Sequence, residues 1–391
     1  MRRAYCFSWR NLGAAILMKK KILQFCTFDS VYNTNLQKQL NNDSDFASEY
    51  SLVSLTLESL IEAFLKNQGI SEYSSLNKLK KLLFWKKFCR YLNITYPFDP
   101  QKDIVNIQFV DFKYIWLIGY LKKNFSRIIL SFWGSDLLRQ SNRRLKAMNK
   151  LFKVSDVITF ETEEMEYIFE KKTNRNYKSK YSLVKFGLSE LDEIDGLSND
   201  DIHRFCHKYK IDSCKKTVVV GYNRIFQQQH LPVIQSLIKY NVSSEDIFII
   251  VPWTYGNHDP EYRRRLEDCI KGKYNYCFLN DHLDEKEIAC LRKITDIFVQ
   301  VQMTDSLSAS MLETLYAKNM VITGRWLPYE ELINKGIKMA YVDSPELVGE
   351  EVRRLIKCSQ NEEERLRNKL IVHDMSSWDA NLEKWKSLYR V

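Results

Sequence analysis

The sequence predicts an α/β protein made of two doubly wound domains, each built on a parallel sheet. The chain has 391 residues, of which 45% are hydrophobic and 13% aromatic, and this is enough apolar surface for two buried cores. Short apolar runs alternate with helical patterns, which is the order of βαβ units. A polar stretch over 189–214 interrupts the alternation, which then starts again. We therefore expect one domain on each side of that stretch.

The first half opens with KILQFCT (21–27), a short apolar run typical of a buried strand. Helical patterns follow over 52–67 and 77–92. Further strands are expected in IVNIQFVD, RIILSFWGSD and DVITFET, with helical patterns in DFKYIWLIGYLKKN and EEMEYIFEKK. Strands that alternate with helices in this way predict a parallel sheet.

The second half repeats this order from KTVVVGYN (216–223) onward. The expected strands are DIFIIVPWTYG, YCFLND, DIFVQVQ and MVITG, and the expected helices are HLPVIQSLIKY, EYRRRLEDCIKG, EKEIACLRKI and ASMLETLYAKN. In such a pair of domains, a ligand is expected at the carboxyl ends of the strands, in the crevice where the two domains face each other.

The chain ends in helical pattern from residue 346, with Trp378, Trp385 and Tyr389 close to the last residue. These aromatic side chains indicate that the final helix packs on the first domain. We expect Met18 to be the natural first residue, with a disordered extension before it. The expected organisation is an extension over 1–17, an N-terminal domain over 18–195, a linker over 196–214, a C-terminal domain over 215–375 and a returning helix over 376–391.

The net charge of +10 favours a polyanionic partner, which could be nucleic acid, an anionic membrane or a phosphorylated substrate. Nine scattered cysteines fit free thiols in a reducing cytoplasm better than a disulfide framework. No run of about 18 uncharged apolar residues occurs in the sequence, so we expect no membrane-spanning helix.

Three segments resemble glycosyltransferases of the GT-B fold that build bacterial surface polysaccharides. TDSLSASMLETLYAKNMVITG (304–324) resembles the acidic-x7-acidic segment of the retaining group-one enzymes, although its first acid is Asp305 where glutamate is usual. FIIVPWTYGNHDPEY (248–262) resembles the 4-acetamido-4,6-dideoxygalactose transferases, and SFWGSDLLR (131–139) resembles a turn shared by several polysaccharide-building transferases. The resemblance extends from about residue 18 to residue 391, and implies a nucleotide-sugar donor and no obligatory metal.

The resemblance assigns the transferred sugar to Asp305 and the ribose of the donor to Glu313. Asp305 is expected in the loop after a strand, and a helix is expected to begin near Ser310. The start of a helix favours a diphosphate through its free N–H groups and its dipole, so the backbone of Ser308, Ala309 and Ser310 is expected at the phosphates. The alternative for this segment is a capping box made by Ser310 and Glu313.

The turn after the strand at 216–220 carries Gly221 and Arg224, which the resemblance places at the leaving diphosphate. Stabilising a departing anion is usually the largest catalytic contribution. The lysine that follows in the resembled family is absent, and His230 is a candidate replacement; a solvated arginine and an ordinary histidine at a helix start are the alternatives. Tyr255 and Gly256 are expected beside the donor, where the tyrosine ring could stack on the base, or else in a turn without ligand.

In the first domain, Asp136 of WGSD is the candidate for orienting the acceptor hydroxyl or acting as general base. Capping of the following helix by Ser135 or Asp136 is the alternative. Phe186 and Gly187, near the domain boundary, are expected in the wall of the cleft.

Two basic segments, KLKKLLFWKKFCRY (78–91) and SNRRLKAMNKLFK (141–153), account best for the positive charge. A Lys-rich helix with leucines and a tryptophan is suited to an anionic membrane, and a solvated helix face is the alternative. No nucleic-acid-binding motif is present in the sequence. His203, Cys206, His207 and Cys214 match no common zinc spacing, and no cofactor is expected.

These observations predict a cytoplasmic hexosyltransferase-type enzyme, peripheral on the inner face of the plasma membrane. It would move a sugar from a nucleotide-diphosphate sugar to a lipid-linked or growing glycan of a capsule, O-antigen or exopolysaccharide. The first domain would bind the acceptor and the second the donor. The alternatives are a non-catalytic scaffold or binding module of a synthesis complex and a GT-B-like sugar-nucleotide epimerase.

Overall fold

The computed structural model describes residues 19–74, 76–257, 259–305, 307–357 and 361–390, and the predicted extension over 1–17 lies outside these ranges. The chain divides into two units. Unit 1 comprises the described residues up to Lys185 and those from Leu382 onward, and unit 2 comprises Phe186–Asn381. The division falls ten residues before the boundary at 195 that the sequence predicts.

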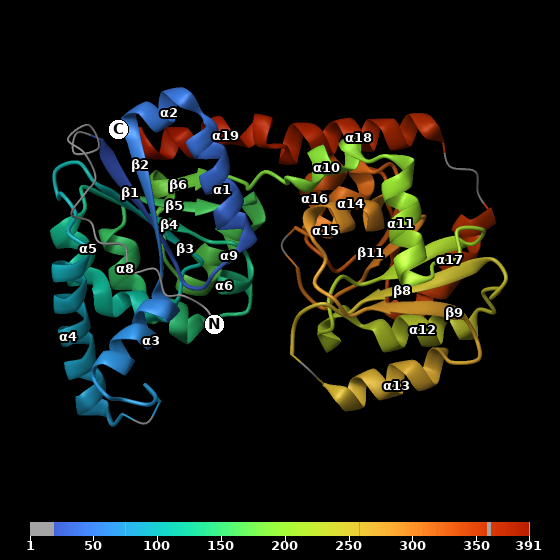
Figure 1. Cartoon of the computed structure of the whole chain (residues 1–391), viewed down its shortest axis with the longest axis horizontal. Coiled ribbons are helices and arrows are strands. Elements are labelled where there is room, and N and C mark those ends of the chain that lie inside the picture. Colours follow the sequence, from blue (N-terminus) through green and yellow to red (C-terminus); the bar gives the residue numbers. More distant parts are fainter. Residues whose placement is uncertain (1–18, 75, 258, 306, 358–360, 391) are drawn as a thin grey trace. The chain divides into compact units, whose positions relative to one another are not determined.

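Unit 1 contains a parallel sheet of six strands in the order β2-β1-β3-β4-β5-β6 (Figure 1). The strands are β1 (Lys20–Cys26), β2 (Tyr50–Thr56), β3 (Ile104–Gln108), β4 (Arg127–Ser131), β5 (Val157–Phe160) and β6 (Tyr181–Leu183). The helices are α1 (Val31–Asn42), α2 (Ser44–Glu49), α3 (Leu57–Asn67), α4 (Lys78–Thr95), η3 (Phe112–Leu117), α5 (Ile118–Asn124), α6 (Ser135–Leu138), α7 (Asn142–Ala147), α8 (Asn149–Val154), α9 (Glu163–Thr173) and η4 (Lys178–Lys180).

The two faces of this sheet differ in chemistry. One face packs apolar side chains such as Phe25 and Ile107 against α3, α4, α5, α8 and α9. The other face is polar at its centre: Gln24 of β1 accepts a hydrogen bond from Gln37 of α1, and Asn106 of β3 accepts one from Ser131 of β4. Both Gln24 and Asn106 are fully buried, so each needs a partner from the elements that cover this face.

The helix expected over 52–67 is wrong in its first part. Residues 50–56 form β2, which pairs in parallel with β1 along its whole length, and α3 begins only at Leu57. The run SLVSLT has no strict alternation, because Leu52 and Val53 are adjacent. Its β-branched residues Val53 and Thr56 suit a strand, and the run pairs with β1. The leucines at 52 and 55 also fit a helical period, which hid the boundary.

Unit 2 contains a second parallel sheet of six strands in the order β12-β11-β10-β7-β8-β9, so the predicted α/β fold class is confirmed. The strands are β7 (Lys216–Val220), β8 (Ile247–Pro252), β9 (Asn275–Leu279), β10 (Ile297–Gln300), β11 (Met320–Gly324) and β12 (Ala340–Val342). The helices are α10 (Glu190–Gly196), α11 (Asn199–Tyr209), η5 (Phe226–Gln228), α12 (His230–Lys239), α13 (Pro260–Ile270), α14 (Glu285–Ile294), α15 (Ala309–Tyr316), α16 (Glu330–Asn334), η6 (Pro345–Leu347), α17 (Val348–Lys357) and α18 (Glu362–Ser376).

The segment over 196–214 differs from the expected linker because most of it is helix α11, which packs on α14 inside unit 2. Ser198 and Asp201 form a capping box at its start, and Phe205 is buried. The segment is polar because one face of α11 is exposed. This polar composition is the reason that the sequence predicts a linker here.

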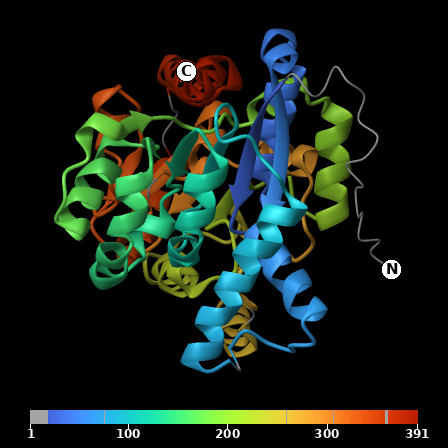
Figure 2. The same ribbon diagram turned by 90° about the vertical axis from the view of Figure 1, so that its left-hand side faces the viewer.

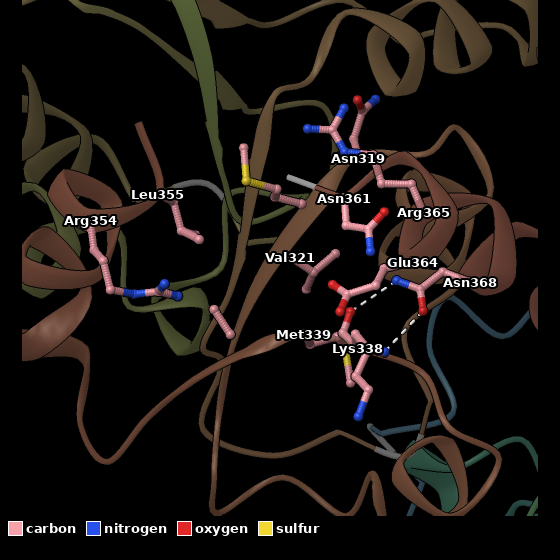
Figure 3. A pocket seen from close by; sticks show the side chains of 12 residues that line it. Asn319, Val321, Lys338, Met339, Arg354, Leu355, Asn361, Glu364, Arg365 and Asn368 are labelled. Carbon is pink, nitrogen blue, oxygen red and sulfur yellow. Dashed lines mark hydrogen bonds between the residues drawn. The ribbon is translucent and has the colours of Figure 1, made fainter. Parts of the chain in front are cut away.

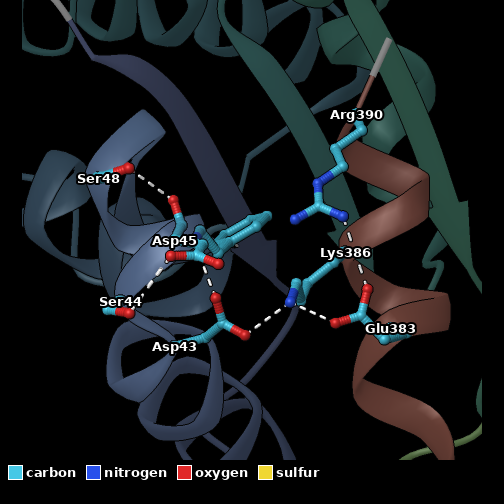
Figure 4. Close-up of polar contacts among 8 residues, drawn as sticks. Asp43, Ser44, Asp45, Ser48, Glu383, Lys386 and Arg390 are labelled. Atoms are coloured by element: carbon cyan, nitrogen blue, oxygen red, sulfur yellow. Dashed lines mark hydrogen bonds and ion pairs between the residues drawn. The ribbon is translucent and has the colours of Figure 1, made fainter.

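The last helix, α19 (Trp378–Tyr389), returns to the N-terminal unit as predicted, since its residues from Leu382 onward belong to unit 1. The Trp385 indole N–H donates to the Lys185 carbonyl at 2.9 Å, and Asn106 donates to the Tyr389 hydroxyl at 2.8 Å. Figure 4 shows the Lys386 ammonium between the carboxylates of Asp43 and Glu383, with Nζ 2.6 Å from Oδ2 of Asp43. Charge and aromatic burial together fix the helix.

Phe186 and Gly187 pack in unit 2, where Gly187 lies against Trp378 at the start of α19. A Cβ atom on Gly187 would lie 2.4 Å from Cδ2 of Trp378, so only glycine fits there. None of the helices in the described ranges combines the length and apolar character needed to cross a membrane.

Candidate functional site

The predicted donor residues lie at the carboxyl edge of the unit 2 sheet, in the loops that follow β7, β8 and β10 and in helix α15 after the last of these loops. Gly221 follows β7 directly, with φ of +66°, and its N–H donates to the Val299 carbonyl at 3.1 Å. A Cβ atom at this position would lie 3.0 Å from Oε1 of Gln228 and Nε2 of His230. Glycine is required here by both backbone conformation and space.

Arg224, Tyr255 and Gly256 are brought together by the loops after β7 and β8. Nε of Arg224 donates to the Gly256 carbonyl at 2.7 Å, and its backbone N–H donates to the Tyr255 carbonyl at 3.1 Å. Gly256 has φ of +110°, and a Cβ atom would lie 2.5 Å from Ile225. The terminal nitrogens of Arg224 make no hydrogen bond or ion pair within the described part of the chain. They are available to an anion.

Tyr255 presents its ring to solvent, because 54% of its surface is exposed. Its hydroxyl end lies among protein atoms, and this burial raises its pKa. The carboxylates of Glu313 and Asp305 act in the same direction, while Asn223 and Arg292 oppose it. The tyrosine hydroxyl is therefore near enough to both acids of the acidic-x7-acidic segment for their charges to affect its pKa.

Asp305 lies in the loop after β10 and is half-buried. Its Oδ2 accepts hydrogen bonds from the Tyr329 hydroxyl at 2.5 Å and from Nε2 of Gln300 at 3.0 Å. Tyr329 and Gln300 are both buried. These two donors hold the carboxylate in one orientation, and charge-assisted hydrogen bonds of this kind are strong.

Helix α15 begins at Ala309, and its N-cap is Ser308, whose hydroxyl accepts from the Met311 N–H at 3.2 Å. The alternative of a capping box between Ser310 and Glu313 is wrong. Ser310 lies inside the helix, and its hydroxyl accepts from Arg292 at 2.7 Å. Both Ser308 and Ser310 fit the capping pattern, but the helix begins directly after Ser308. The cap therefore lies two residues before the predicted one.

Glu313 is 4% exposed and forms a buried ion pair with Arg292 of α14, with Nε 2.7 Å from Oε2. Its Oε1 accepts no hydrogen bond from the residues that the structure describes. Burial, and after it the nearby Glu313 carboxylate, raises the pKa of Glu190 in α10 to about 7. Glu313, the second acid of the segment, is thus held in α15 by the guanidinium of Arg292.

His230 begins α12 and is fully buried, with Nδ1 3.3 Å from the Tyr262 hydroxyl. Burial lowers its pKa to about 3, so the imidazole is neutral at physiological pH. A neutral ring does not replace the lysine missing after Arg224, and the ordinary buried histidine is the better interpretation.

Sequence reasoning missed Arg292, Gln300 and Tyr329, which hold the two acids. Two signals were available. Arg292 stands four positions after Ile288 on the apolar face of EKEIACLRKI, and a charge on such a face predicts a buried partner. Gln300 alternates with valines in VQVQ at the end of β10, which marks a polar row on one face of a strand.

Asp136, the predicted general base, is 1% exposed in α6, which follows β4 in unit 1. Oδ1 accepts from the N–H groups of Trp133 and Gly134 at 3.0 Å, and Oδ2 accepts from the Val110 N–H at 2.8 Å. Burial raises its pKa to about 7, although these three hydrogen bonds favour the ionised form. Asp136 therefore holds the turn before α6. The capping alternative is wrong, because Gly134 is the N-cap of α6 and no side chain caps this helix, and the general-base assignment stays a prediction.

Replacing Asp136 by alanine is expected to lower the free energy of unfolding by about 2–4 kcal/mol, because three buried N–H groups lose their acceptor. Urea unfolding of the two proteins measures the difference, with Asp45→Ala, an exposed aspartate of α2, as the matched control. A variant that kept full stability and the wild-type acceptor KM but lost kcat would restore the general-base assignment.

A pocket of about 320 Å³ lies elsewhere in unit 2, next to the first residues of β11 and β12. Figure 3 shows Asn368 bonded to the backbone of Lys338, with Asn361, Glu364 and Arg365 on the same side of the pocket and Arg354 on the other. It contains none of the predicted site residues, because these follow the carboxyl ends of the strands.

No protein-family model and no curated protein matches the sequence. The structure is nevertheless similar to solved structures over almost its whole length. A glycosyltransferase from Rickettsia africae ESF-5 has a TM-score of 0.72 and 16% identity, covering 95% of this chain and 98% of the other. Anabaena Alr3699/HepE in complex with UDP and glucose has a TM-score of 0.67 and 12% identity, covering 95% and 100%.

The apo structure of OtsA is a third similar structure, with a TM-score of 0.69 and 12% identity, covering 95% of this chain and 99% of the other. At these identities the likeness shows the fold alone. The chain has the GT-B fold, with two α/β units each built on six parallel strands.

Proposed function

We propose that this protein is a glycosyltransferase that takes its sugar from a nucleotide-diphosphate donor. The observation that carries the proposal is the grouping of Arg224, Tyr255 and the start of α15 at one edge of the unit 2 sheet. An arginine with open terminal nitrogens, a solvent-facing aromatic ring and a helix start suit a diphosphate attached to a base. Similar structures hold UDP and UDP-glucose.

In this proposal, Arg224 and the backbone of Ser308, Ala309 and Ser310 bind the diphosphate and stabilise it as it leaves. Tyr255 stacks on the base. Asp305, oriented by Tyr329 and Gln300, accepts hydrogen bonds from the transferred sugar. Arg292 holds Oε2 of Glu313, and Oε1 of the same carboxylate accepts a hydrogen bond from a ribose hydroxyl of the donor.

The test is donor turnover by the purified chain with a panel of UDP-, GDP- and dTDP-sugars. We expect one nucleotide series to bind and to release nucleoside diphosphate, faster when a glycan acceptor is added. Binding without release, with or without acceptor, would favour the non-catalytic scaffold. Conversion of the sugar nucleotide without a glycan product would favour the epimerase. No binding of any donor would reject the site.

We further propose that the acceptor is a lipid-linked glycan of a bacterial surface polysaccharide, and that α4 binds the anionic membrane that carries it. Leu79, Leu82 and Leu83 are 67%, 54% and 49% exposed on one face of this helix. The opposite face is buried, with Phe84 and Phe88 packed on Phe64 of α3. Figure 2 shows α3 and α4 side by side, both extending beyond the strands of unit 1.

The charge of α4 is suited to the same surface. The helix contains six Lys and Arg residues and no Asp or Glu. Lys80, Lys86, Lys87 and Arg90 are exposed next to the three leucines. Leucines that enter the interface, with cations beside the headgroups, suit a surface-bound amphipathic helix.

Changing Leu79, Leu82 and Leu83 together to glutamine is expected to weaken binding to vesicles containing phosphatidylglycerol by about tenfold or more, because each buried apolar side chain contributes roughly 1.5–3 kcal/mol. Vesicle co-sedimentation at low and high salt measures the effect. The matched control changes Leu366 and Leu370 of α18, which are exposed to a similar degree. Equal binding of the triple variant, or equal binding to neutral vesicles, would contradict the membrane proposal.

A further inference from the structure

Four aromatic rings gather at the carboxyl edge of the unit 1 sheet, and we call them the aromatic platform: Phe28, Tyr32, Phe109 and Trp133. Phe28 follows β1, Tyr32 is the second residue of α1, and Phe109 and Trp133 follow β3 and β4. The Phe28 and Phe109 ring centroids are 4.7 Å apart. Trp133 lies 5.8–6.1 Å from the other three rings, each in an edge-to-face arrangement. The platform thus joins the ends of three adjacent strands.

The platform differs from the core below it. Phe25 and Phe132, its near neighbours in sequence, are almost completely buried, whereas all four platform rings are only half-buried. The carboxyl ends of the strands are where doubly wound sheets bind ligands. Aromatic rings that are partly open at this edge are therefore positioned for a ligand rather than for the core.

Phe109 adopts a strained backbone conformation, with φ of +60°. This left-handed region is a genuine outlier for a bulky side chain, and such strain persists where surrounding contacts enforce it. Here the Thr27 hydroxyl donates to the Phe109 carbonyl at 2.6 Å, and the Phe109 N–H donates to the Ser131 carbonyl at 3.1 Å. These contacts hold the ring at the edge of the sheet at a cost in stability.

Trp133 is held in place by its neighbours. Its indole N–H donates to Oε1 of Gln108 at 2.8 Å, and its backbone N–H donates to Asp136. Gly134 follows with φ of 122°, a conformation that only glycine adopts readily. Asp136 therefore fixes the turn that presents the indole.

Two buried amides next to the platform have an atom without a partner among the described residues. These atoms are Nε2 of Gln108, which bonds Trp133 through its other end, and Oδ1 of Asn33, which follows Tyr32. Buried polar atoms without partners are rare and call for a ligand or ordered water. Nε2 of Gln108 is enclosed by protein, so a hydroxylated ligand reaches it only when the Gln108 side chain turns, whereas a hydrocarbon chain offers no partner at all.

We infer that the aromatic platform binds a sugar ring of the acceptor, and this inference rests on the proposed function. A pyranose has an apolar face of C–H groups and a rim of hydroxyls. Its C–H face packs on the electron-rich faces of aromatic rings, while its rim meets amide groups. Trp133 and Phe109 thereby select a glycan acceptor, and Asp136 acts only by positioning Trp133.

The experiment uses the full chain and octyl glycosides of common hexoses as acceptors, with octyl tetraethylene glycol ether as the lipid-only probe. Trp133→Ala is expected to raise the acceptor KM at least tenfold, while donor binding and donor hydrolysis in water stay unchanged. Trp133→Phe should recover part of the loss. Tyr167→Ala, an exposed tyrosine of α9, is the matched control.

Phe109→Gly provides a second variant that is expected to fold, because glycine tolerates the left-handed backbone. It should lose acceptor binding in the same way. Unchanged acceptor KM in both variants, or equal binding of the glycosides and the lipid-only probe, would overturn the inference. If the wild-type chain turns over no donor, the proposed function fails separately. Direct binding of the octyl glycosides, measured by saturation-transfer NMR, still tests the platform. Binding that is lost in both variants supports the inference, and binding that is absent or unaltered overturns it.

Discussion

The Arg224→Ala variant is expected to turn over its donor about 10²–10³-fold more slowly than the wild type, the usual effect of removing one group that stabilises a developing anion. Arg224 is half-buried, and its Nε donates to the carbonyl of Gly256. Its terminal nitrogens make no hydrogen bond or ion pair with the described residues. The free energy of unfolding should therefore change little, while the leaving diphosphate loses its cation.

Steady-state kinetics and urea unfolding of the same preparation measure the two effects. Arg224→Lys is expected to recover part of kcat, because lysine keeps the charge and loses the forked geometry. Arg265→Ala, an exposed arginine of α13, is the control for charge alone. Wild-type turnover in Arg224→Ala would remove this residue from the site.

The Glu313→Ala variant is expected to lose about 3–5 kcal/mol of stability, because it leaves a buried guanidinium without its counter-ion. Arg292 is 5% exposed, and Nη1 is already buried without a partner among the described residues. Loss of activity in this variant alone would therefore not distinguish a donor contact from a damaged fold. Chemical denaturation measures the stability change.

The double variant Glu313→Leu with Arg292→Met separates these two roles. Replacing a buried ion pair by apolar side chains of similar size is often neutral or stabilising. We therefore expect it to unfold near the wild-type urea concentration and to bind nucleoside diphosphate more weakly. Wild-type donor affinity in a stable double variant would show that Glu313 is purely structural.

Much of the fold could be predicted from the sequence because each parallel strand is a short apolar run followed by a helix. The alternation from Lys216 to Gly324 is clean, and β7 to β11 appear where the pattern places them, whereas the three-residue strand β12 was not predicted. Strand β2 was hidden because it runs into α3 without a turn residue, and because its leucines at 52 and 55 also fit a helical period. The segment over 196–214 was misjudged because the composition of an exposed helix resembles that of a linker.

The candidate site was predictable as a set of loops but not as a set of contacts. Residues at the ends of neighbouring parallel strands must converge, which is why Arg224, Tyr255 and Gly256 meet. The partner of Glu313 could not be assigned from spacing, since Arg292 lies on a different helix. Asp136 shows the same limit, because a sequence does not reveal whether a carboxylate faces a substrate or three backbone amides.

The position of α19 has a consequence for biosynthesis. Tyr389 and Trp385 are almost completely buried in unit 1, where they meet β3 and Lys185. Domains generally fold from the N-terminus while the ribosome is still translating. During synthesis, α19 does not cover the polar face of the unit 1 sheet, and Tyr389 does not contact Asn106, until nearly two hundred residues after Lys185 have been translated. Unit 2 is thus translated in full before the unit that precedes it is complete.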